Sequence, residues 1–255
     1  MRNRRDFASV ERFCFFFGYA RSGHSVVGSL LNAHPEMVVS NELHAVRFVQ
    51  HGFNRNQLFA LILARDASFG EMGRKWTGYD YAVPNQHQGE FRTLRVIGDK
   101  KGGATSREFA SHPGLLDRLR TVVGVPIRAV HVTRNPFDNI ARMSMSGKGT
   151  DLGSMIVRYS GLCDSVSRTR KQLSAEELID IRHEDFSRAP ADFLADLCRF
   201  VGVSTSGDYL RDCASIVREP EIRPKDKVEW SAADITAVNR IIDRHPFMAG
   251  YSFDS

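Results

Sequence analysis

The sequence predicts an α/β protein of three layers, in which helices cover both faces of a central, mostly parallel sheet. Short apolar runs of strand length alternate with segments whose apolar residues recur at helical spacing. Charged or polar residues directly follow four of these runs, at the edge where open parallel sheets bind their ligands. With 255 residues the chain is long enough for one large domain, so we expect a single domain over 1–255.

Five apolar runs are the expected strands. The run "FCFFF" at 13–17 is uninterrupted and ends at Gly18, which is typical of a buried strand that leads into a loop. The other expected strands are 37–40, 95–100, 127–134 and 177–186. Residues 76–89 are rich in aromatic residues and interrupted by glycine and proline, so we expect a hairpin or an ordered loop there.

Helices are expected between these strands. Apolar residues recur at helical spacing in three segments, 26–31, part of 44–67 and 191–201. Another helix is expected from about Pro136, because proline suits a first helical turn and the acid Asp138 suits the positive end of the helix dipole. Ser231 and Asp234 have the spacing of a helix cap and predict a last helix after them.

The composition excludes several classes of protein. With 42% hydrophobic and 25% charged residues, the chain has the composition of an ordinary globular protein. No apolar run approaches the roughly 20 residues of a membrane span. The basic first residues lack the apolar segment of a secretory signal, so we expect a cytoplasmic location.

The cysteines and the net charge indicate which kinds of ligand to expect. Cys14, Cys163, Cys198 and Cys213 form no C-x-x-C pair, and we expect reduced structural thiols and no metal site. The net charge of +5 suits an anionic ligand, and by itself it does not distinguish a nucleotide from a nucleic acid.

The stretch "FFFGYARSGHS" has the outline of a loop that binds phosphate. Gly18, Gly23 and Ser25 match the backbone part of the loop of nucleotide hydrolases, but His24 stands in place of their lysine. A histidine is largely neutral at pH 7 and is a poor clamp for a triphosphate. Arg21 offers a planar fork to an oxyanion instead, and such a fork together with backbone donors neutralises a phosphate-like group without a metal.

This loop and three later segments resemble a known family. "GYARSGHS" looks like the 5′-phosphosulfate loop of sulfotransferases that use 3′-phosphoadenosine 5′-phosphosulfate (PAPS). "HVTRNPFDNIARMSMS" resembles their 3′-phosphate motif, and "IRHEDFSRAPADFLADLCRFVGV" is similar to their Tyr-Glu-Asp-Leu segment and the helix after it. "KVEWSAADI" is also of their kind. The matches run in order through 13–251 and imply the P-loop-like sulfotransferase fold.

The resemblance implies a set of donor-binding residues. The 5′-phosphosulfate would be held by Arg21, Ser22, Gly23, His24 and Ser25, and the 3′-phosphate by Arg134. Arg142 stands where the family usually has a serine and is expected to meet the same phosphate, with Ser144 as the alternative. His183 takes the place of a tyrosine that contacts adenine in relatives.

The resemblance also implies catalytic roles, for Glu42, Lys100 and Arg21. Glu42 is the expected general base, at a spacing from the loop that resembles the tyrosylprotein and carbohydrate branch. His44 is the competing base. Lys100 is expected to neutralise the charge that develops on the leaving oxygen, with its neighbour Lys101 as the rival.

The expected acceptor pocket lies within 44–90. Three aromatic residues in that segment could line it or could simply pack in the core: Trp76, Tyr79 and Tyr81. Three basic residues in 223–229 could form a flap over the nucleotide or an ordinary solvated charged run: Arg223, Lys225 and Lys227.

The sequence thus predicts a PAPS-dependent sulfotransferase that sulfates a hydroxyl of a carbohydrate, a small molecule or tyrosine, releases the nucleotide product PAP and requires no metal. A P-loop small-molecule kinase is the first alternative, and it would need a loop lysine and Mg²⁺. A non-catalytic nucleic-acid-binding protein is the second, although no basic stripe interleaved with aromatic residues supports it. The oligomeric state stays open.

Overall fold

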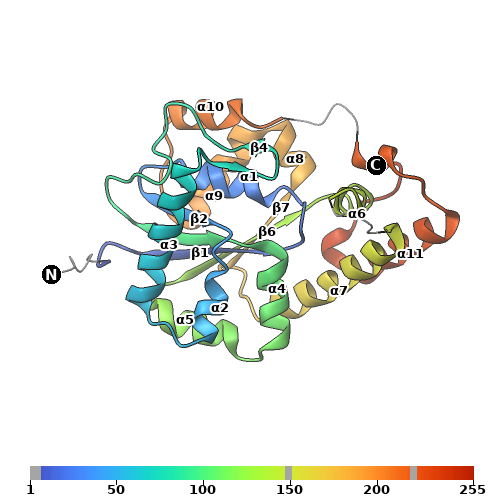
Figure 1. Cartoon of the computed structure of the whole chain (residues 1–255), viewed down its shortest axis with the longest axis horizontal. Coiled ribbons are helices and arrows are strands. Elements are labelled where there is room, and N and C mark those ends of the chain that lie inside the picture. The colour runs from blue at the N-terminus through green and yellow to red at the C-terminus, as the bar shows by residue number, and fades with distance from the viewer. Residues whose placement is uncertain (1–6, 147–150, 219–222) are drawn as a thin grey trace.

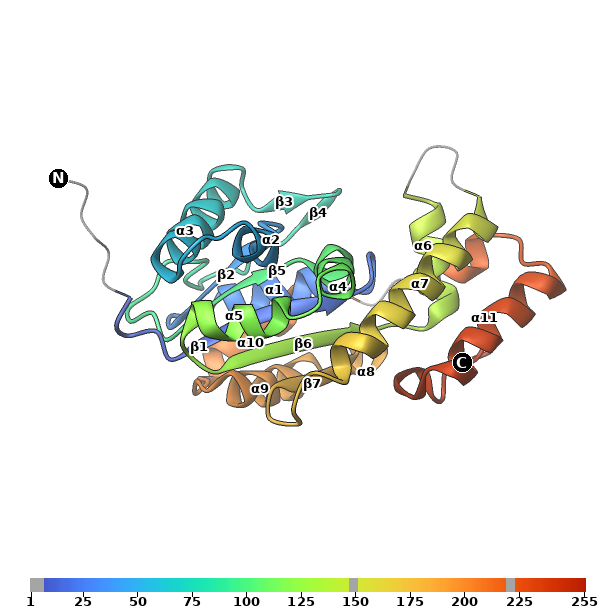
Figure 2. The same cartoon turned by 90° about the horizontal axis from the view of Figure 1, so that it is seen from below.

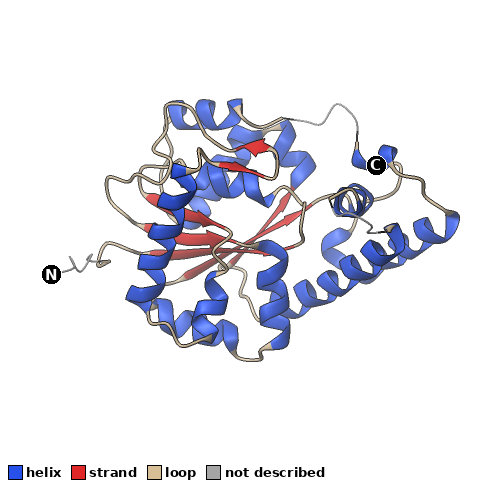
Figure 3. Cartoon of the chain, viewed as in Figure 1, coloured by secondary structure: helices blue, strands red, loops and turns tan. Residues whose placement is uncertain are grey.

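A computed structural model describes residues 7–146, 151–218 and 223–255. Its centre is a five-stranded sheet in the order β2-β5-β1-β6-β7. The strands are β1 (Arg12–Gly18), β2 (Met37–Asn41), β5 (Val96–Lys100), β6 (Ile127–Thr133) and β7 (Leu178–Arg182). All neighbouring pairs are parallel, and helices flank the sheet (Figure 3). The predicted α/β fold class is confirmed, whereas residues 1–6, which hold most of the basic N-terminal stretch, lie outside the described part.

The central strand β1 shows why its apolar run does not alternate with polar residues. Phe13, Phe15 and Phe17 belong to one buried cluster, and Cys14 and Phe16 belong to another. Because successive side chains of a strand point to opposite faces, each face of β1 supplies one of the two cores. The strand is therefore buried on both sides, as a strand in the middle of three layers must be.

Two groups of helices cover the faces of the sheet (Figure 1). The cluster on one face includes residues of α2 (Ala45–Gln50), α3 (Arg55–Glu71), α4 (Gly102–Ser111), α5 (Leu115–Val123) and α7 (Leu152–Arg170). The cluster on the other includes residues of α1 (His24–Asn32), α8 (His183–Arg188), α9 (Pro190–Val201) and α10 (Gly207–Ser215).

The remaining elements lie beyond the sheet. Helices α6 (Pro136–Ser144) and α11 (Ala232–Arg244) pack with α7 past the ends of β6 and β7, as Figure 2 also shows. Two short 3₁₀ helices flank α11, with η1 (Pro224–Lys227) before it and η2 (Pro246–Met248) after it. A separate antiparallel hairpin joins β3 (Lys75–Trp76) and β4 (Tyr79–Asp80).

Two expectations about the elements were only partly right. The strand expected at 177–186 ends at Arg182, because His183 begins α8 and the acids Glu184 and Asp185 suit the first turn of that helix. Of the hairpin or ordered loop expected at 76–89, the hairpin covers 75–80, and an irregular segment follows it. The helix cap at Ser231 is present and opens α11.

The cysteines and the helices agree with the compositional analysis. All four cysteines are buried and free, and desolvation raises the pKa of the Cys14 and Cys198 thiols to about 12. Within 7–146, 151–218 and 223–255, every helix is too short or too polar to cross a membrane.

Candidate active site

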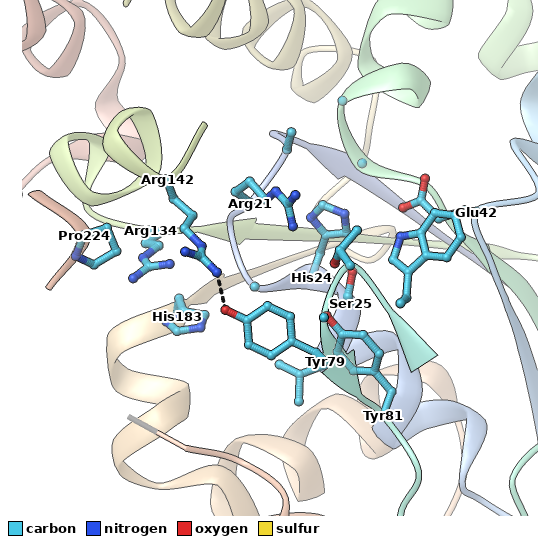
Figure 4. A pocket seen from close by; sticks show the side chains of 18 of the residues that line it. Arg21, His24, Ser25, Glu42, Tyr79, Tyr81, Arg134, Arg142, His183 and Pro224 are labelled. Atoms are coloured by element: carbon cyan, nitrogen blue, oxygen red, sulfur yellow. Dashed lines mark hydrogen bonds between the residues drawn. The ribbon is translucent and has the colours of Figure 1, made fainter. Parts of the chain in front are cut away.

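A cavity of about 950 Å³ opens at the edge of the sheet where β1, β2, β5 and β6 end. It brings together most of the residues expected in a site: Arg21, Gly23, His24, Ser25, Glu42, Arg134, Arg142 and His183 line it. In Figure 4, Arg134, Arg142 and His183 lie at one end and Glu42 at the other, with Arg21, His24 and Ser25 between them. Ser22 and Lys100 lie behind the wall, each almost fully buried.

The loop after β1 is held in place from two helices. The backbone N–H of Gly18 donates to Ser106 Oγ of α4 over 2.7 Å, and Nδ2 of Asn139 in α6 donates to the carbonyl of Ala20 over 2.7 Å. Arg21 has φ of 66°, a left-handed conformation that is costly for a residue with a side chain. The surrounding structure thus fixes the loop and directs the Arg21 side chain into the cavity.

Two histidines of the cavity wall are uncharged at neutral pH. Burial, with Lys100 nearby, lowers the pKa of His24 to about 3. Burial, with Arg134 nearby, lowers the pKa of His183 to about 4. His24 Nδ1 lies 3.1 Å from Ser22 Oγ, so the side chain of Ser22 serves the loop itself rather than the cavity. His24 therefore cannot replace a phosphate-binding lysine by charge, as the sequence predicted.

Glu42 lies between two lysines. Lys100 Nζ is 2.6 Å from Glu42 Oε1 and 2.9 Å from Ser25 Oγ, and Lys101 Nζ contacts Glu42 Oε2. Burial opposes the ionisation of Glu42, but the two ammonium groups outweigh it and lower its pKa to about 2. A single buried lysine thus connects the phosphate loop to the expected base.

A buried carboxylate shapes the turn that carries Glu42. Glu42 and His44 both have left-handed φ angles, of 62° and 68°. Asp99 accepts hydrogen bonds from the backbone N–H groups of Leu43 (3.0 Å) and Ala45 (2.9 Å) and from the Ser40 hydroxyl (2.9 Å). Asp99 is therefore a positioning residue that compensates the strain of the turn.

The competing base His44 is directed elsewhere. Its Nε2 lies 3.7 Å from Glu108 Oε1 on α4, and it does not line the cavity. Burial lowers its pKa. Glu42 is thus the better placed of the two candidates.

The opposite end of the cavity carries two arginines. Arg134 makes no hydrogen bond or ion pair with another residue of the described ranges, and burial lowers its pKa. Arg142 contacts the Tyr79 hydroxyl, with its guanidinium 5.8 Å from the centre of that ring. The hydroxyl of Ser144 donates to the Ala141 carbonyl over 2.9 Å, so Arg142 and not Ser144 faces the cavity.

The aromatic part of the wall comes from Trp76 and Tyr79 of the hairpin β3-β4 and from Tyr81, which follows β4. All three line the cavity, and Tyr79 is 48% exposed. The structure thus favours the lining role over simple core packing for these residues.

Two of the basic residues in 223–229 are held by other parts of the protein. Arg223 Nε donates to Asp138 Oδ2 over 3.0 Å, and the backbone N–H of Lys225 donates to Asp138 Oδ1 over 3.0 Å. The Lys225 side chain is buried against the C-terminal residues. Of the three basic residues only Lys227 lines the cavity. Both readings of this segment were wrong for Arg223 and Lys225, because the carboxylate that pairs with Arg223 and accepts the Lys225 N–H lies in α6, far away in sequence.

Two buried acids, Asp99 and Asp138, are engaged by other groups. The oxygens of Asp99 accept the three hydrogen bonds of the turn, and those of Asp138 bind Arg223 and Lys225. In the part of the chain that the structure describes, no three His, Cys, Asp or Glu side chains are grouped as metal ligands.

Sequence analysis missed three further arginines of the wall, one of which, Arg218, follows α10. Arg107 lies on α4 and Arg158 on α7, and both line the cavity. Neither helix was among the predicted elements. The apolar spacing of Met155, Ile156, Tyr159 and Leu162 could have revealed α7, but not which of its polar residues faces the cavity.

We expect Gly23→Ala to destabilise the fold through a specific clash. Gly23 has φ of 95°, and a Cβ there would lie 1.9 Å from Cδ2 of His183. Backbone strain and overpacking together should cost at least about 2 kcal/mol of unfolding free energy, measured by urea denaturation. The double variant Gly23→Ala/His183→Ala should recover the part due to the clash. Gly73→Ala is the control for strain alone, because Gly73 has φ of 68° and no atom within 4 Å of its Cβ position; an equal loss there would contradict the clash.

The lowered pKa of Glu42 predicts a pH dependence of stability. Because its folded pKa of about 2 lies below the ordinary 4.5, ionised Glu42 stabilises the fold above about pH 4.5, and this contribution is lost as pH falls towards 2. The difference in unfolding free energy between wild type and Glu42→Gln should shrink as the pH of the urea titration is lowered from 6 to 3. A difference that stays constant would show that the lysines do not hold the carboxylate.

Comparisons with known proteins agree with this geometry. A family model described as "Sulfotransferase family" matches residues 14–207, more than half of the chain. The search of the curated proteins gave no match. Among solved structures, the sulfotransferase domain of the Synechococcus PCC 7002 olefin synthase superposes with a TM-score of 0.56 at 17% identity, covering 94% of this chain and 96% of that one.

Two further structures are similar in fold. The sulfotransferase domain from the curacin biosynthetic pathway has a TM-score of 0.53 at 15% identity and covers 92% of this chain and 97% of its own. The mouse sulfotransferase SULT7A1, crystallised in complex with PAP, has a TM-score of 0.51 at 10% identity, with 94% and 85% covered. Together with the family match, the parallel sheet and the loop at its edge show that this chain belongs to the sulfotransferase family.

Proposed function

We propose that the protein transfers the sulfuryl group of PAPS to a hydroxyl of an acceptor and releases PAP. The observation that carries the proposal is that Arg21 and Arg134 line one cavity, and neither makes a hydrogen bond or an ion pair with another described residue. Partly buried guanidinium groups without a partner favour an anionic ligand. PAPS carries one anionic group at its 5′ position and another at its 3′ position, which matches this separation of charge.

The proposed donor lies across the cavity. Backbone N–H groups of the loop and of the first turn of α1, with the fork of Arg21, would hold the 5′-phosphosulfate. His24 and Ser25 lie in that turn. Arg134 and Arg142 would bind the 3′-phosphate, and His183, beside Arg134, would contact the adenine. The phosphate would take the place of Tyr79 on Arg142.

The proposed reaction is an in-line displacement at sulfur. Glu42 accepts the proton of the acceptor hydroxyl as its oxygen attacks, and the bond from sulfur to the bridging oxygen breaks on the opposite side. Lys100 neutralises the charge that develops on that oxygen. When Lys100 turns towards it, Glu42 loses one of its two cations and becomes a stronger base. Arg21 stabilises the charge on the transferring group.

The other parts of the proposal concern the acceptor, the metal requirement and the location in the cell. Residues 44–90 within a single domain over 1–255 would shape the acceptor pocket, since the hairpin β3-β4 supplies its aromatic wall. The acceptor would be a carbohydrate, a small molecule or tyrosine. Metal-independent chemistry and a cytoplasmic location stay predictions of the sequence.

Arg21→Ala and Arg134→Ala should each weaken the binding of adenosine 3′,5′-bisphosphate. The loss of a charge-assisted contact predicts an affinity about 10- to 100-fold lower, measured by isothermal titration calorimetry. The matched control is Arg199→Ala, because Arg199 is exposed on α9, is paired with Asp196 and lies outside the cavity. Unchanged affinity in either cavity variant would reject its role. Tighter binding of ATP with Mg²⁺ than of the bisphosphate would favour the kinase alternative.

Glu42→Gln should separate catalysis from binding. The variant should keep its affinity for adenosine 3′,5′-bisphosphate and lose about 10²- to 10⁴-fold in turnover, because an amide cannot accept the proton. The assay follows transfer from ³⁵S-labelled PAPS to an acceptor found by screening. His44→Gln should keep its turnover. If instead His44→Gln loses activity and Glu42→Gln does not, the bases are assigned the wrong way round.

A further inference from the structure

Two arginines of the cavity wall have no part in the proposed donor site. Arg107 on α4 and Arg158 on α7 are both exposed, and neither makes a hydrogen bond or an ion pair with another residue in the described ranges. Their helices pack against each other (Figure 1). One wall of the cavity therefore presents two guanidinium groups that are free to bind a ligand.

Contacts around Gly103 place these arginines beside the phosphate loop. The position of a Cβ on Gly103 lies 3.7 Å from Nη1 of Arg107, 3.6 Å from Cδ2 of Leu162 and 3.5 Å from the backbone nitrogen of Ala20. The Arg107 side chain thus lies back along α4 towards the loop. Arg158 is four residues before Leu162 and shares its face of α7. Arg107 therefore lies near the loop that would hold the sulfuryl group, and Arg158 lines the same cavity from the neighbouring helix.

The charges of the cavity are unbalanced on this wall. Eight arginine and lysine side chains line the cavity, against two carboxylates. Three of the arginines are assigned to the donor, and Lys101 pairs with Glu42. Arg218 and Lys227 come from the end of α10 and from η1. Among the described residues, Arg107 and Arg158 are thus left without an ion-pair partner in the cavity wall.

We propose that the acceptor is a hydroxy acid: besides the hydroxyl that is sulfated, it carries a carboxylate that binds Arg107 and Arg158. A carboxylate matches the planar fork of a guanidinium, and two such forks fix its orientation. This inference rests on the proposed function, because it concerns the acceptor half of the same cavity. It narrows the acceptor to acidic sugars, phenolic acids or tyrosine beside an acidic residue.

The test compares acids with their neutral amides. The pairs are 4-hydroxyphenylacetate with 4-hydroxyphenylacetamide, galacturonate with galacturonamide, and a tyrosine peptide with Glu beside Tyr and its Gln counterpart. Binding is measured by calorimetry at low salt, with and without adenosine 3′,5′-bisphosphate, and transfer with ³⁵S-labelled PAPS. At least one acid should bind about fivefold more tightly than its amide. The preference should decrease as salt is added, because both arginines are exposed.

Variants show whether these two residues cause the preference. Arg107→Ala/Arg158→Ala should abolish it and leave the affinity for adenosine 3′,5′-bisphosphate within about twofold of wild type. Arg240→Ala, an exposed arginine on α11 outside the cavity, should change neither. The proposal is wrong if no acid exceeds its amide in wild type, or if the preference survives in the double variant. A failure of the proposed donor site gives a different result. In that case the wild type would not bind adenosine 3′,5′-bisphosphate, whether or not it binds the acids.

Discussion

The ammonium of Lys100 is the interaction on which the site depends. Its side chain is 2% exposed, and a charge buried to that extent must be paired. The partners come from two other elements, Glu42 at the end of β2 and Ser25 in the first turn of α1. A Cβ on Gly28 would lie 2.8 Å from Cγ of Lys100, so α1 needs a glycine where the lysine stem passes. One buried cation thereby joins a strand end, the phosphate loop and the expected base.

The same arrangement makes the lysine suited to move charge during a reaction. An ammonium has three N–H donors, and the structure shows two of them, directed at Ser25 and Glu42. Burial lowers the pKa of Lys100, although Glu42 and Asp99 oppose the effect. The donor that is directed at Glu42 can turn to a leaving oxygen while Ser25 keeps the side chain in place. Because Lys101 also binds Glu42, the carboxylate would stay paired during this change. Its basicity would rise, and the carboxylate would not be left as an isolated buried charge.

Sequence reasoning succeeded where a local sequence pattern is compatible with only one structural arrangement. The run at 13–17 had to be a strand buried on both faces, and the residues after the strands had to meet at one edge of a parallel sheet. It failed where the partner of a side chain is chosen by tertiary packing. The pairing of Arg223 with Asp138 spans 85 residues, and no local pattern reveals it. Arg107 and Arg158 were missed for the same reason, since periodicity predicts which residues a helix buries and not which exposed ones face a cavity.

The position of the hairpin β3-β4 depends on a second buried ion pair. A two-stranded hairpin as short as β3-β4 is not stable alone, so its position must come from elsewhere. Arg74, which precedes β3, binds Asp66 of α3 through two contacts of 2.9 and 3.2 Å, and Asp66 also accepts a 2.8 Å hydrogen bond from Asn32 at the end of α1. The helix that begins at the phosphate loop thus also anchors the hairpin. The hairpin side chains that line the cavity can then vary without moving this part of the wall, because Arg74, Asp66 and Asn32 fix the backbone and not the surface that it presents.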